Sequence, residues 1–381
     1  MKKTRGFGLL GIILIMIITA IVSCIATGVI MLNSSSNIVS DNIKDLSNDE
    51  DLIEFIEIYE TLVSKYYDEI DKSGMLDAAE EGMLNFLGDK YTTYLEDSEY
   101  NEILNELAGT YNGIGIVIEN NKIIEVTKDS PAERVGLEAN DLIVKVNDAD
   151  VINMTASQIG DLIKSGAKTI SLVIDRNGVR LNFTVEKTDL INIAIDYERI
   201  ENTKIGYLQI KKFSENLDLQ VSDALKELEN SGIESLIIDV RNNVGGYLSA
   251  AEKTASIFLQ SGKIIYSLET SNNTIKYKDE TKENRNYDII VLINNNSASA
   301  SEILAAALKE SYGATLVGTK SYGKGKVQQI ISESAKYTFA KWLTPNGDCI
   351  DGIGINPDYN VTNIPSDMTD YQLNKAIELL S

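Results

Sequence analysis

Short, unbroken apolar runs in the second half of the chain are the feature that most limits what it can fold into. Residues 235–240 (SLIIDV) and 288–293 (DIIVLI) are apolar at almost every position, so each predicts a strand buried on both faces. Strands of this kind occur in parallel sheets that helices cover. Because strand and helix patterns alternate from Leu190 onward, including a strand at 263–269 (KIIYSLE), we expect an α/β core.

Two regions precede this core. Residues 46–108 have an acidic, helical pattern, which predicts a pair of helices that bury one face; a role in dimerisation is left open. Residues 109–188 contain short strands, two short helices and an Asn177-Gly178 hairpin turn, which predict a small barrel-like binding module. The expected fold class is therefore a multidomain combination of α+β and α/β parts.

The first 32 residues predict a membrane anchor. The basic start MKKTR precedes an uncharged, mostly apolar segment from Gly6 to Leu32, and about 20 apolar residues span the hydrocarbon core as a helix. The basic start favours a cytoplasmic N-terminus, so the remaining domains would be extracytoplasmic. The alternative is a lipoprotein lipidated at Cys24, because IVSC at 21–24 resembles a lipoprotein cleavage box, although residues 25–32 stay apolar.

Composition excludes several classes of function. The net charge of −22 disfavours nucleic acid as a partner, because an acidic surface repels phosphate backbones. The chain has no histidine and only two cysteines, Cys24 and Cys349, of which the first lies in the apolar segment. We therefore expect no disulfide framework and no metal site.

A cluster of serines, NNSASASEIL at 295–304, follows the second apolar strand. Ser299 and Glu302 have the S-x-x-E spacing of a capping box, which would explain this serine as a helix cap alone. The place also suits catalysis, because sites in α/β sheets gather at the carboxyl ends of strands and helix N-termini favour negative charge. Spacing alone does not choose among Ser297, Ser299 and Ser301.

Without histidine, a base for such a serine has to come from another residue type. SYGKGKVQQ at 321–329 places Lys324 between two glycines after a strand, and a lysine can act as general base when burial lowers its pKa. Ser-Lys pairs are a known variant of serine catalysis. The alternative is a loop of solvated lysines, which we expect for Lys320 and Lys326; a mononucleotide loop is disfavoured because G-x-x-x-x-G-K-[ST] is absent.

DVRNNVGGYL at 239–248 supplies candidate donors for an oxyanion. The segment ends a predicted buried strand, and its glycines Gly245 and Gly246 would expose backbone N–H groups of the kind that acyl transfer requires. A plain strand–turn–helix junction explains the same residues equally well.

Taken together, NNSASASEILAAAL, SYGKGKVQ and DVRNNVGG resemble the carboxyl-terminal processing peptidases, also called tail-specific proteases. GDKYTTYL, the PDZ-like segments GIGI and SPAERVGLEANDLIVKVND, and LTPNGDCIDGIGINPD extend the resemblance over roughly residues 50 to 360, in the family's order. It implies a serine endopeptidase with a PDZ domain and a protease core of the crotonase-like type, which cleaves proteins near their C-termini without a cofactor.

The resemblance also implies a role for each site residue. It makes Ser299 the nucleophile, Lys324 the general base and Gln328 the residue that orients the lysine. The N–H of Ala300, with that of a glycine of the 245–246 pair, would form the oxyanion hole. Ser299 and Lys324 stand 25 positions apart, the spacing of the family.

In the PDZ-like segment, the resemblance implies a loop that binds a substrate's terminal carboxylate through backbone N–H groups. Its residues would be Gly113, Ile114, Gly115 and Ile116. The alternative is an ordinary apolar strand start. The expected partners are protein or peptide substrates with free C-termini, the membrane through the N-terminal helix, and a second copy of the chain as a further option.

Three positions depart from the family's pattern. Asn140 stands where glycine is usual, Val244 where proline is common, and Glu310 where some members have aspartate. Asparagine tolerates the left-handed conformation that a glycine would adopt. None of the three belongs to the Ser-Lys-Gln set, and the role of Glu310 is left undecided.

The expected organisation has six parts: 1–32 cytoplasmic tip and anchor, 33–45 linker, 46–108 helical region, 109–188 PDZ domain, 189–363 protease core, and 364–381 C-terminal helix. A different class of function also fits part of the sequence. A catalytically silent PDZ adaptor would bind C-terminal tails without cleaving them, and it would not need Ser299, Lys324 or Gln328.

Overall fold

The computed structural model describes residues 49–381 except 283, 333 and 365. The predicted anchor and linker lie outside these residues. Within the described part of the chain, no helix is long and apolar enough to cross a membrane. The chain divides into two compact units, Met1–Glu80 and Glu81–Ser381.

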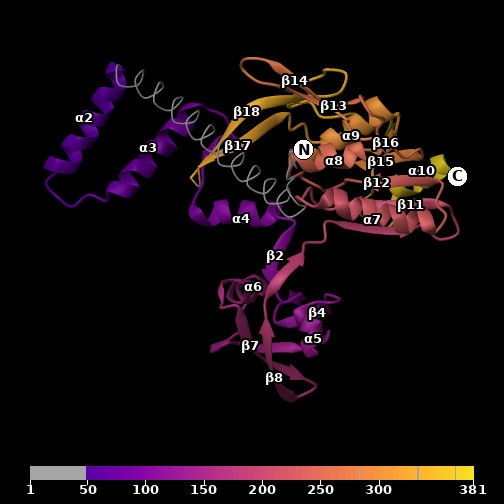
Figure 1. Ribbon diagram of the computed structural model, residues 1–381, viewed down its shortest axis with the longest axis horizontal. Helices are drawn as coiled ribbons and strands as arrows, with labels where there is room; N and C mark the ends of the chain where they lie inside the picture. The colour runs from indigo at the N-terminus through magenta and orange to yellow at the C-terminus, as the bar shows by residue number, and fades with distance from the viewer. Residues whose placement is uncertain (1–48, 283, 333, 365) are drawn as a thin grey trace, which may run out of the picture. The chain divides into compact units, whose positions relative to one another are not determined.

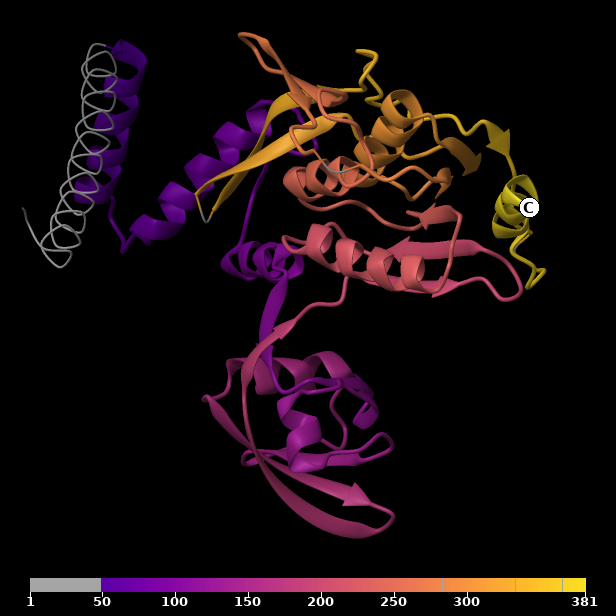
Figure 2. The ribbon, with the colours of Figure 1, turned by 45° about the vertical axis from the view of Figure 1, so that its right-hand side comes forward.

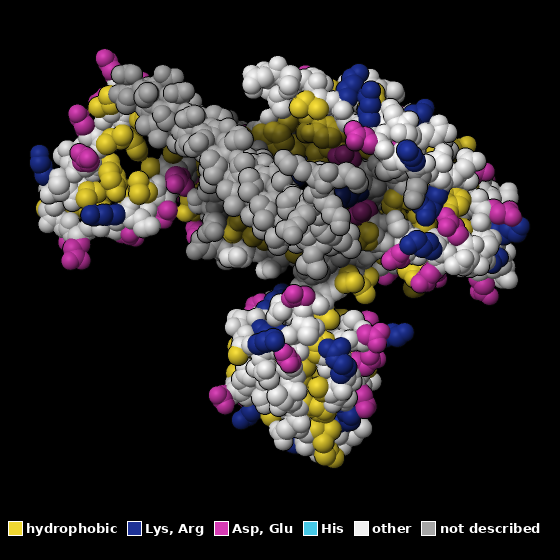
Figure 3. Space-filling model, viewed as in Figure 1, with side chains coloured by type: hydrophobic (Ala, Val, Ile, Leu, Met, Phe, Trp, Pro, Cys, Tyr) yellow, Lys and Arg dark blue, Asp and Glu magenta, His cyan; other side chains and the backbone are white. Residues whose placement is uncertain are grey.

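The first unit contains α2 (Glu50–Lys65) and the start of α3 (Lys72–Phe86), with the carboxylate of Asp49 accepting N–H groups of the first turn of α2. The prediction that these helices bury one face is wrong for the described residues. No residue of α2 is buried and α3 buries only Leu84, so apolar side chains such as Phe55 remain exposed. Figure 3 shows hydrophobic side chains on the surface where Figure 1 draws α2 and α3.

A six-stranded sheet organises the second unit, in the order β10-β11-β12-β15-β16-β19. Its strands are β10 (Ile195–Arg199), β11 (Ile205–Ile210), β12 (Ser235–Asp239), β15 (Asp288–Ile293), β16 (Thr315–Gly318) and β19 (Tyr359–Asn360). All neighbours are parallel except β10, which runs antiparallel to β11.

Helices cover both faces of this sheet, which explains the unbroken apolar runs. The helices α7 (Leu217–Asn230), α8 (Leu248–Ser256) and α9 (Ala300–Ala307) share one core with alternate strand residues such as Leu236 and Val291. The remaining residues, such as Ile237 and Leu292, pack with α10 (Tyr371–Leu380), which is yellow at the right of Figure 2. The predicted α/β core and closing helix are confirmed (Figure 1).

A second sheet is antiparallel throughout, with the path β1-β18-β13-β14 and with β17 beside β18. Its strands are β1 (Thr93–Tyr94), β13 (Ile264–Glu269), β14 (Thr274–Lys278), β17 (Lys326–Ser332) and β18 (Ala335–Leu343). The prediction that 263–269 continues the parallel alternation is therefore wrong. β13 is buried on both faces like β12, but a hairpin to β14 takes it into this other sheet.

Residues 110–191 form a β-rich module with a core of its own. The strands β3 (Ile116–Glu119), β4 (Lys122–Val126), β5 (Leu142–Val146), β6 (Ala149–Asp150), β7 (Thr169–Arg176) and β8 (Val179–Glu186) form one sheet. The pair β2 (Thr110–Gly113) and β9 (Thr188–Ile191) brings the two ends together, and the helices are α5 (Pro131–Val135) and α6 (Ala156–Ser165). Positive φ values at Asn177 (55°) and Gly178 (82°) confirm the predicted hairpin turn.

Two further elements belong to the second unit. Helix α4 (Asp97–Leu107) lies between β1 and β2 in the sequence. A single π-helical turn, η1 (Leu308–Tyr312), continues α9 and ends at Gly313 in the left-handed conformation.

Candidate active site

The parallel register brings the two predicted motif loops to one edge of the sheet. Asp239 at the end of β12 pairs with Leu292 near the end of β15, so the loops 240–247 and 294–299 leave the sheet side by side. Their contact is direct, because Ala298 N–H donates to the carbonyl of Asn243 at 3.1 Å. The α/β topology therefore assembles the serine and glycine motifs at the carboxyl edge of the strands.

The structure distinguishes the three serines that spacing left equivalent. The hydroxyls of Ser297 and Ser301 are fully buried and donate to the carbonyls of Val240 and Asn243, both at 2.8 Å. Ser299, by contrast, lines a cavity of about 710 Å³. Two serines thus hold the loops together, and Ser299 is the one whose side chain borders a space that a substrate can enter.

The backbone at Ser299 is strained, with φ 56° and ψ −116°. Strain of this kind costs about 1–3 kcal/mol and persists only where the surroundings enforce it. Gly245 makes room for the turn, because a Cβ there would lie 2.9 Å from the carbonyl oxygen of Ala298 and 3.0 Å from Cβ of Ser299. Glycine at 245 is required by this close approach.

Lys324 lines the same cavity. Burial lowers the pKa of its amine below the ordinary lysine value, the positive charge of Lys336 lowers it further, and Glu302 opposes the shift. The Tyr91 ring lies 5.4 Å from Nζ. Lowering the pKa increases the fraction of neutral amine near pH 7, which is the form that can accept a proton.

One buried carboxylate fixes the backbone of both residues. Oε2 of Glu302 accepts the N–H of Ser299 and the N–H of Lys324, each at 2.9 Å. Oε1 accepts the Gly323 N–H at 2.7 Å and the Ser321 hydroxyl at 2.5 Å. These four donors offset the cost of burying the charge. The S-x-x-E spacing predicts only a capping role for Glu302, and the structure adds its hydrogen bonds to the lysine loop.

The reactive side chains are close but not hydrogen-bonded. Among the described residues, no hydrogen bond joins Lys324 Nζ to Ser299 Oγ or to Gln328. The amide of Gln328 lines the cavity and donates instead to the Thr338 hydroxyl across the β17–β18 pair, at 3.3 Å. Catalytic hydrogen bonds are often long or absent before substrate binds.

The candidate oxyanion donors differ in their availability. Gly245 N–H donates to the side chain of Asn243 at 2.8 Å, so it is already used. The N–H groups of Gly246 and Ala300 find no acceptor among the residues that the structure describes. Gly246 has φ 150°, and a Cβ there would lie 2.3 Å from the carbonyl of Phe213, so only glycine fits. The geometry favours Gly246 with Ala300 over Gly245.

The expectation of a solvated Lys326 is wrong. Its ammonium donates to Asp89 at 2.8 Å and borders the catalytic cavity, whereas Lys320 is exposed as expected. Burial alone would raise the pKa of Asp89, but hydrogen bonds from Lys326, Thr338 and Thr92 lower it to about 2. Asp89 therefore remains ionised at neutral pH and ties the GDKYTTYL segment to the lysine loop.

The three positions that depart from the family's pattern have distinct environments. Asn140 has φ 80°, which is the left-handed conformation expected there. Val244 is 73% exposed on the rim of the catalytic cavity. Glu310 accepts the backbone N–H of Asn346 at 2.8 Å, so it supports the turn at 344–347.

The predicted carboxylate loop of the β-rich module lies between β2 and β3. Ile114 is buried, and Gly115 has φ 83°, with its Cβ position only 2.3 Å from Cβ of Ser130. The carbonyls of Ile114 and Gly115 accept N–H groups of Ala132 and Thr127. Within the described part of the chain, their own N–H groups have no acceptor, which leaves two donors for a ligand.

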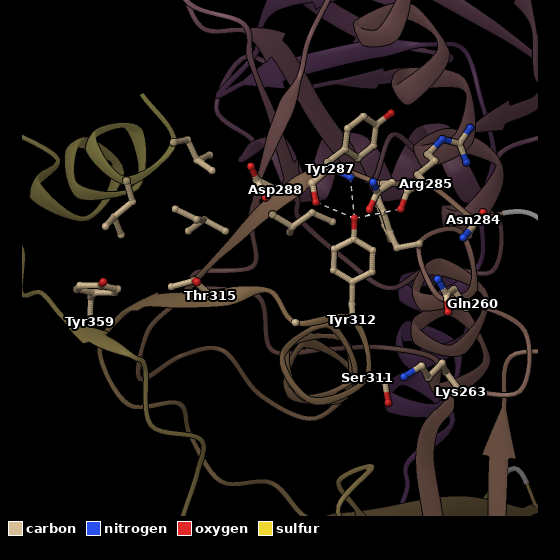
Figure 4. Close-up of a pocket in the computed structure, with 17 residues that line it drawn as sticks. Gln260, Lys263, Asn284, Arg285, Tyr287, Asp288, Ser311, Tyr312, Thr315 and Tyr359 are labelled. Atoms are coloured by element: carbon tan, nitrogen blue, oxygen red, sulfur yellow. Dashed lines mark hydrogen bonds between the residues drawn. The ribbon is translucent and has the colours of Figure 1, made fainter.

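A second hollow of about 710 Å³ lies at the opposite edge of the sheet, where β15 and β16 begin (Figure 4). Asp288 and Thr315 line it, and the Tyr312 hydroxyl at its centre accepts the N–H of Tyr287 at 2.8 Å and contacts the carbonyls of Arg285 and Tyr287. This hydroxyl thus fixes the loop before β15. Because catalytic groups gather at the carboxyl edge, this hollow is not the candidate active site.

Within the described residues, no group of three or more His, Cys, Asp or Glu side chains is arranged to hold a metal ion. The side chains and backbone groups described above are a serine, a partly buried lysine and backbone N–H donors.

Family descriptions match three parts of the chain. "Peptidase family S41" matches residues 204–361, "PDZ domain" matches residues 122–176, and "Activating protease CtpB N-terminal domain" matches residues 18–99. The first match contains Ser299, Lys324 and the glycine pair.

Relatives that match most of this chain are also proteases. The carboxy-terminal processing protease CtpA of Bacillus subtilis is 32% identical over 355 residues, which cover 90% of this chain and 75% of that protein. CtpB of the same organism is 33% identical over 327 residues, covering 82% and 68%. The solved photosystem II D1 C-terminal processing protease has a similar fold, with a TM-score of 0.51, 24% identity, and coverage of 87% and 92%.

Replacing Glu302 with glutamine tests the carboxylate clamp. A glutamine amide has one acceptor oxygen instead of two, so it can bind only one of the two pairs of donors, and its NH2 group would face the other pair. We expect kcat/KM to fall about 100-fold, because a displacement of about 1 Å is enough for such a loss. Peptide hydrolysis would be measured beside thermal unfolding.

Glu310→Gln is the matched control, because it changes a carboxylate that binds a distant turn. It should retain nearly full activity. Wild-type kcat/KM in Glu302→Gln would show that the clamp does not position the reactive pair.

Proposed function

Because the chain belongs to peptidase family S41, among its carboxy-terminal processing proteases, we propose that it cleaves protein substrates near their C-termini through a Ser299–Lys324 dyad. The chain is a multidomain α/β serine peptidase with a PDZ domain, so a catalytically silent adaptor is not the favoured function. The observation that carries the dyad is that both side chains line one cavity, while one oxygen of Glu302 binds both backbone N–H groups. We assign the protease core to the crotonase-like type.

In the first half of the reaction, neutral Lys324 accepts the proton of Ser299 as Oγ attacks the scissile carbonyl carbon. The carbonyl oxygen becomes an oxyanion, and the N–H groups of Gly246 and Ala300 are placed to bind it. The lysine ammonium then gives its proton to the leaving nitrogen as the C–N bond breaks. The products are an acyl-enzyme and the released C-terminal fragment.

In the second half, water replaces the released amine. Lys324 accepts a proton from the water as it attacks the ester carbonyl, and the proton then returns to Ser299 as its oxygen leaves. The acid product then loses its remaining proton to solvent and departs as a carboxylate. Gln328 orients the lysine in this scheme, by turning its amide from Thr338 toward Nζ when substrate fills the cavity.

The PDZ domain binds the substrate's C-terminus. An extended peptide adds as a strand, and its carboxylate accepts the N–H groups of Ile114 and Gly115 in the loop Gly113–Ile116. Support comes from the match to the PDZ family and from the unused donors of this loop.

The protein acts outside the cytoplasm, anchored by its N-terminal apolar segment. In cells that express the full chain, we expect it in the membrane fraction and digestible by protease added from outside. Cys24→Ala should leave it there, whereas loss from the membrane would indicate the lipoprotein. A protected or fully soluble chain would contradict the anchor.

Lys324→Ala should reduce kcat/KM by about 100- to 10,000-fold, the usual contribution of a general base, without changing the melting temperature much. Ser299→Ala should lose turnover and retain substrate binding. Hydrolysis would be read by mass spectrometry on a protein with a small apolar tail. Lys320→Ala removes an exposed lysine four residues away and should behave as wild type. Undiminished turnover in Lys324→Ala would refute the dyad.

Activity should rise with pH through the lowered pKa of Lys324, because only the neutral amine accepts the serine proton. Acidification should therefore inactivate the enzyme, and the chain contains no imidazole to which this loss could belong. The measurement is kcat/KM against pH, with folding followed by circular dichroism. A flat profile from about pH 5 to 9 would be incompatible with lysine as the base.

A further inference from the structure

The catalytic cavity is cationic although the chain as a whole is acidic. Among the residues that the structure describes, four lysines line it against a single acidic residue, Glu252, in a chain of net charge −22. The lysines are Lys212, Lys324, Lys326 and Lys336. Two of them already have an explanation, because Lys326 is paired with Asp89 and Lys324 is the proposed base.

Lys336 has neither an ion-pair partner among the described residues nor a role in the proposed reaction. It lies on β18, opposite Ile330 of β17 and Thr93 of β1. Thr338, two residues further along the same face of the strand, receives the amide of Gln328. Among the described residues no carboxylate lies within ion-pair distance of Lys336. The strand thus places an unpaired cation beside the Ser-Lys-Gln set.

Charged groups on several elements influence the protonation of Lys324. Glu302 on α9 favours its charged form, but four donors already occupy that carboxylate. The Tyr91 ring lies 5.4 Å from Nζ, and Lys326 carries its own counterion. After burial, the positive charge of Lys336 is the largest influence on the pKa of Lys324, and it acts against protonation.

We propose that Lys336 is a positioning residue of the peptidase site, whose fixed ammonium keeps the neighbouring Lys324 in its neutral form. Two ammonium groups in one cavity repel each other, and at Lys324 burial adds to this repulsion, so Lys324 is the amine that gives up its proton. Lys336 lies partly buried on β18. This inference rests on the proposed function, because it needs Lys324 as the base.

The test compares Lys336→Gln with Lys336→Arg, measuring kcat/KM against pH. Without the cation, Lys324 holds its proton to higher pH. The rising limb of the profile of kcat/KM against pH should therefore move to higher pH, and kcat/KM at pH 7 should fall about tenfold. Activity should recover at alkaline pH. Arginine keeps the charge, so its limb should stay near that of wild type. Lys341→Gln removes an exposed charge from the same strand and is the matched control.

A second readout separates this role from substrate binding. An uncharged fluorophosphonate probe phosphonylates Ser299: the Oγ–P bond forms, fluoride leaves, and the serine proton passes to Lys324. The labelling rate should show the same shift with pH in Lys336→Gln. If peptide hydrolysis falls while labelling is unchanged, Lys336 binds a substrate carboxylate instead, and the proposal is overturned.

Two further outcomes distinguish a failure of the role of Lys336 from a failure of the proposed function. An unmoved limb in a folded Lys336→Gln, with Lys324→Ala inactive, would overturn the role of Lys336 and leave the proposed function standing. An active Lys324→Ala would overturn the function itself. Should glutamine impair folding, Lys336→Met provides a neutral side chain of similar length, and it should give the same shift with unchanged thermal unfolding.

Discussion

The buried carboxylate of Glu302 is the interaction on which the site depends. It joins the start of α9 to the loop after β16, two segments that the sheet brings to one edge but that share no strand pairing. The only backbone hydrogen bond between the two loops themselves, among the described residues, is that from the Tyr322 N–H to the Ser297 carbonyl, so the carboxylate adds the contacts at Ser299 and Lys324 themselves. With it, both backbones are bound to one side chain before any substrate arrives, which is the preorganisation that catalysis requires.

A serine peptidase without histidine has to produce a neutral amine in a strongly acidic protein. Negative charge around a lysine would stabilise its ammonium, so the general surroundings oppose the chemistry. The structure counters this locally: burial and a second lysine lower the pKa of Lys324, while the carboxylates nearby, Glu302 and Asp89, are occupied by other donors. Lys326 balances the charge of Asp89, whereas the donors to Glu302 are uncharged, so burial and Lys336 lower the pKa of Lys324 against the opposing effect of Glu302.

Much of this could be predicted from the sequence, for physical reasons. Strands buried on both faces have to be apolar throughout, so the apolar runs predict β12 and β15. The carboxyl ends of parallel strands lie at one edge of the sheet, so the motif loops that follow these strands are expected to meet there. β13 was misassigned because burial is equally complete in an antiparallel sheet. The role of Glu302 was underestimated, since its partners Gly323 and Lys324 are about 20 positions away. Lys326 was misjudged because its partner, Asp89, lies 237 positions earlier.

The most direct measurement is a structure of the enzyme with a peptide phosphonate bonded to Ser299, which imitates the tetrahedral intermediate. The account predicts Lys324 Nζ at about 2.6–3.2 Å from Oγ of Ser299. It also predicts that the phosphonyl oxygen accepts the N–H groups of Gly246 and Ala300. A lysine amine that stays beyond hydrogen-bond reach in this complex, with no water between, would contradict the account.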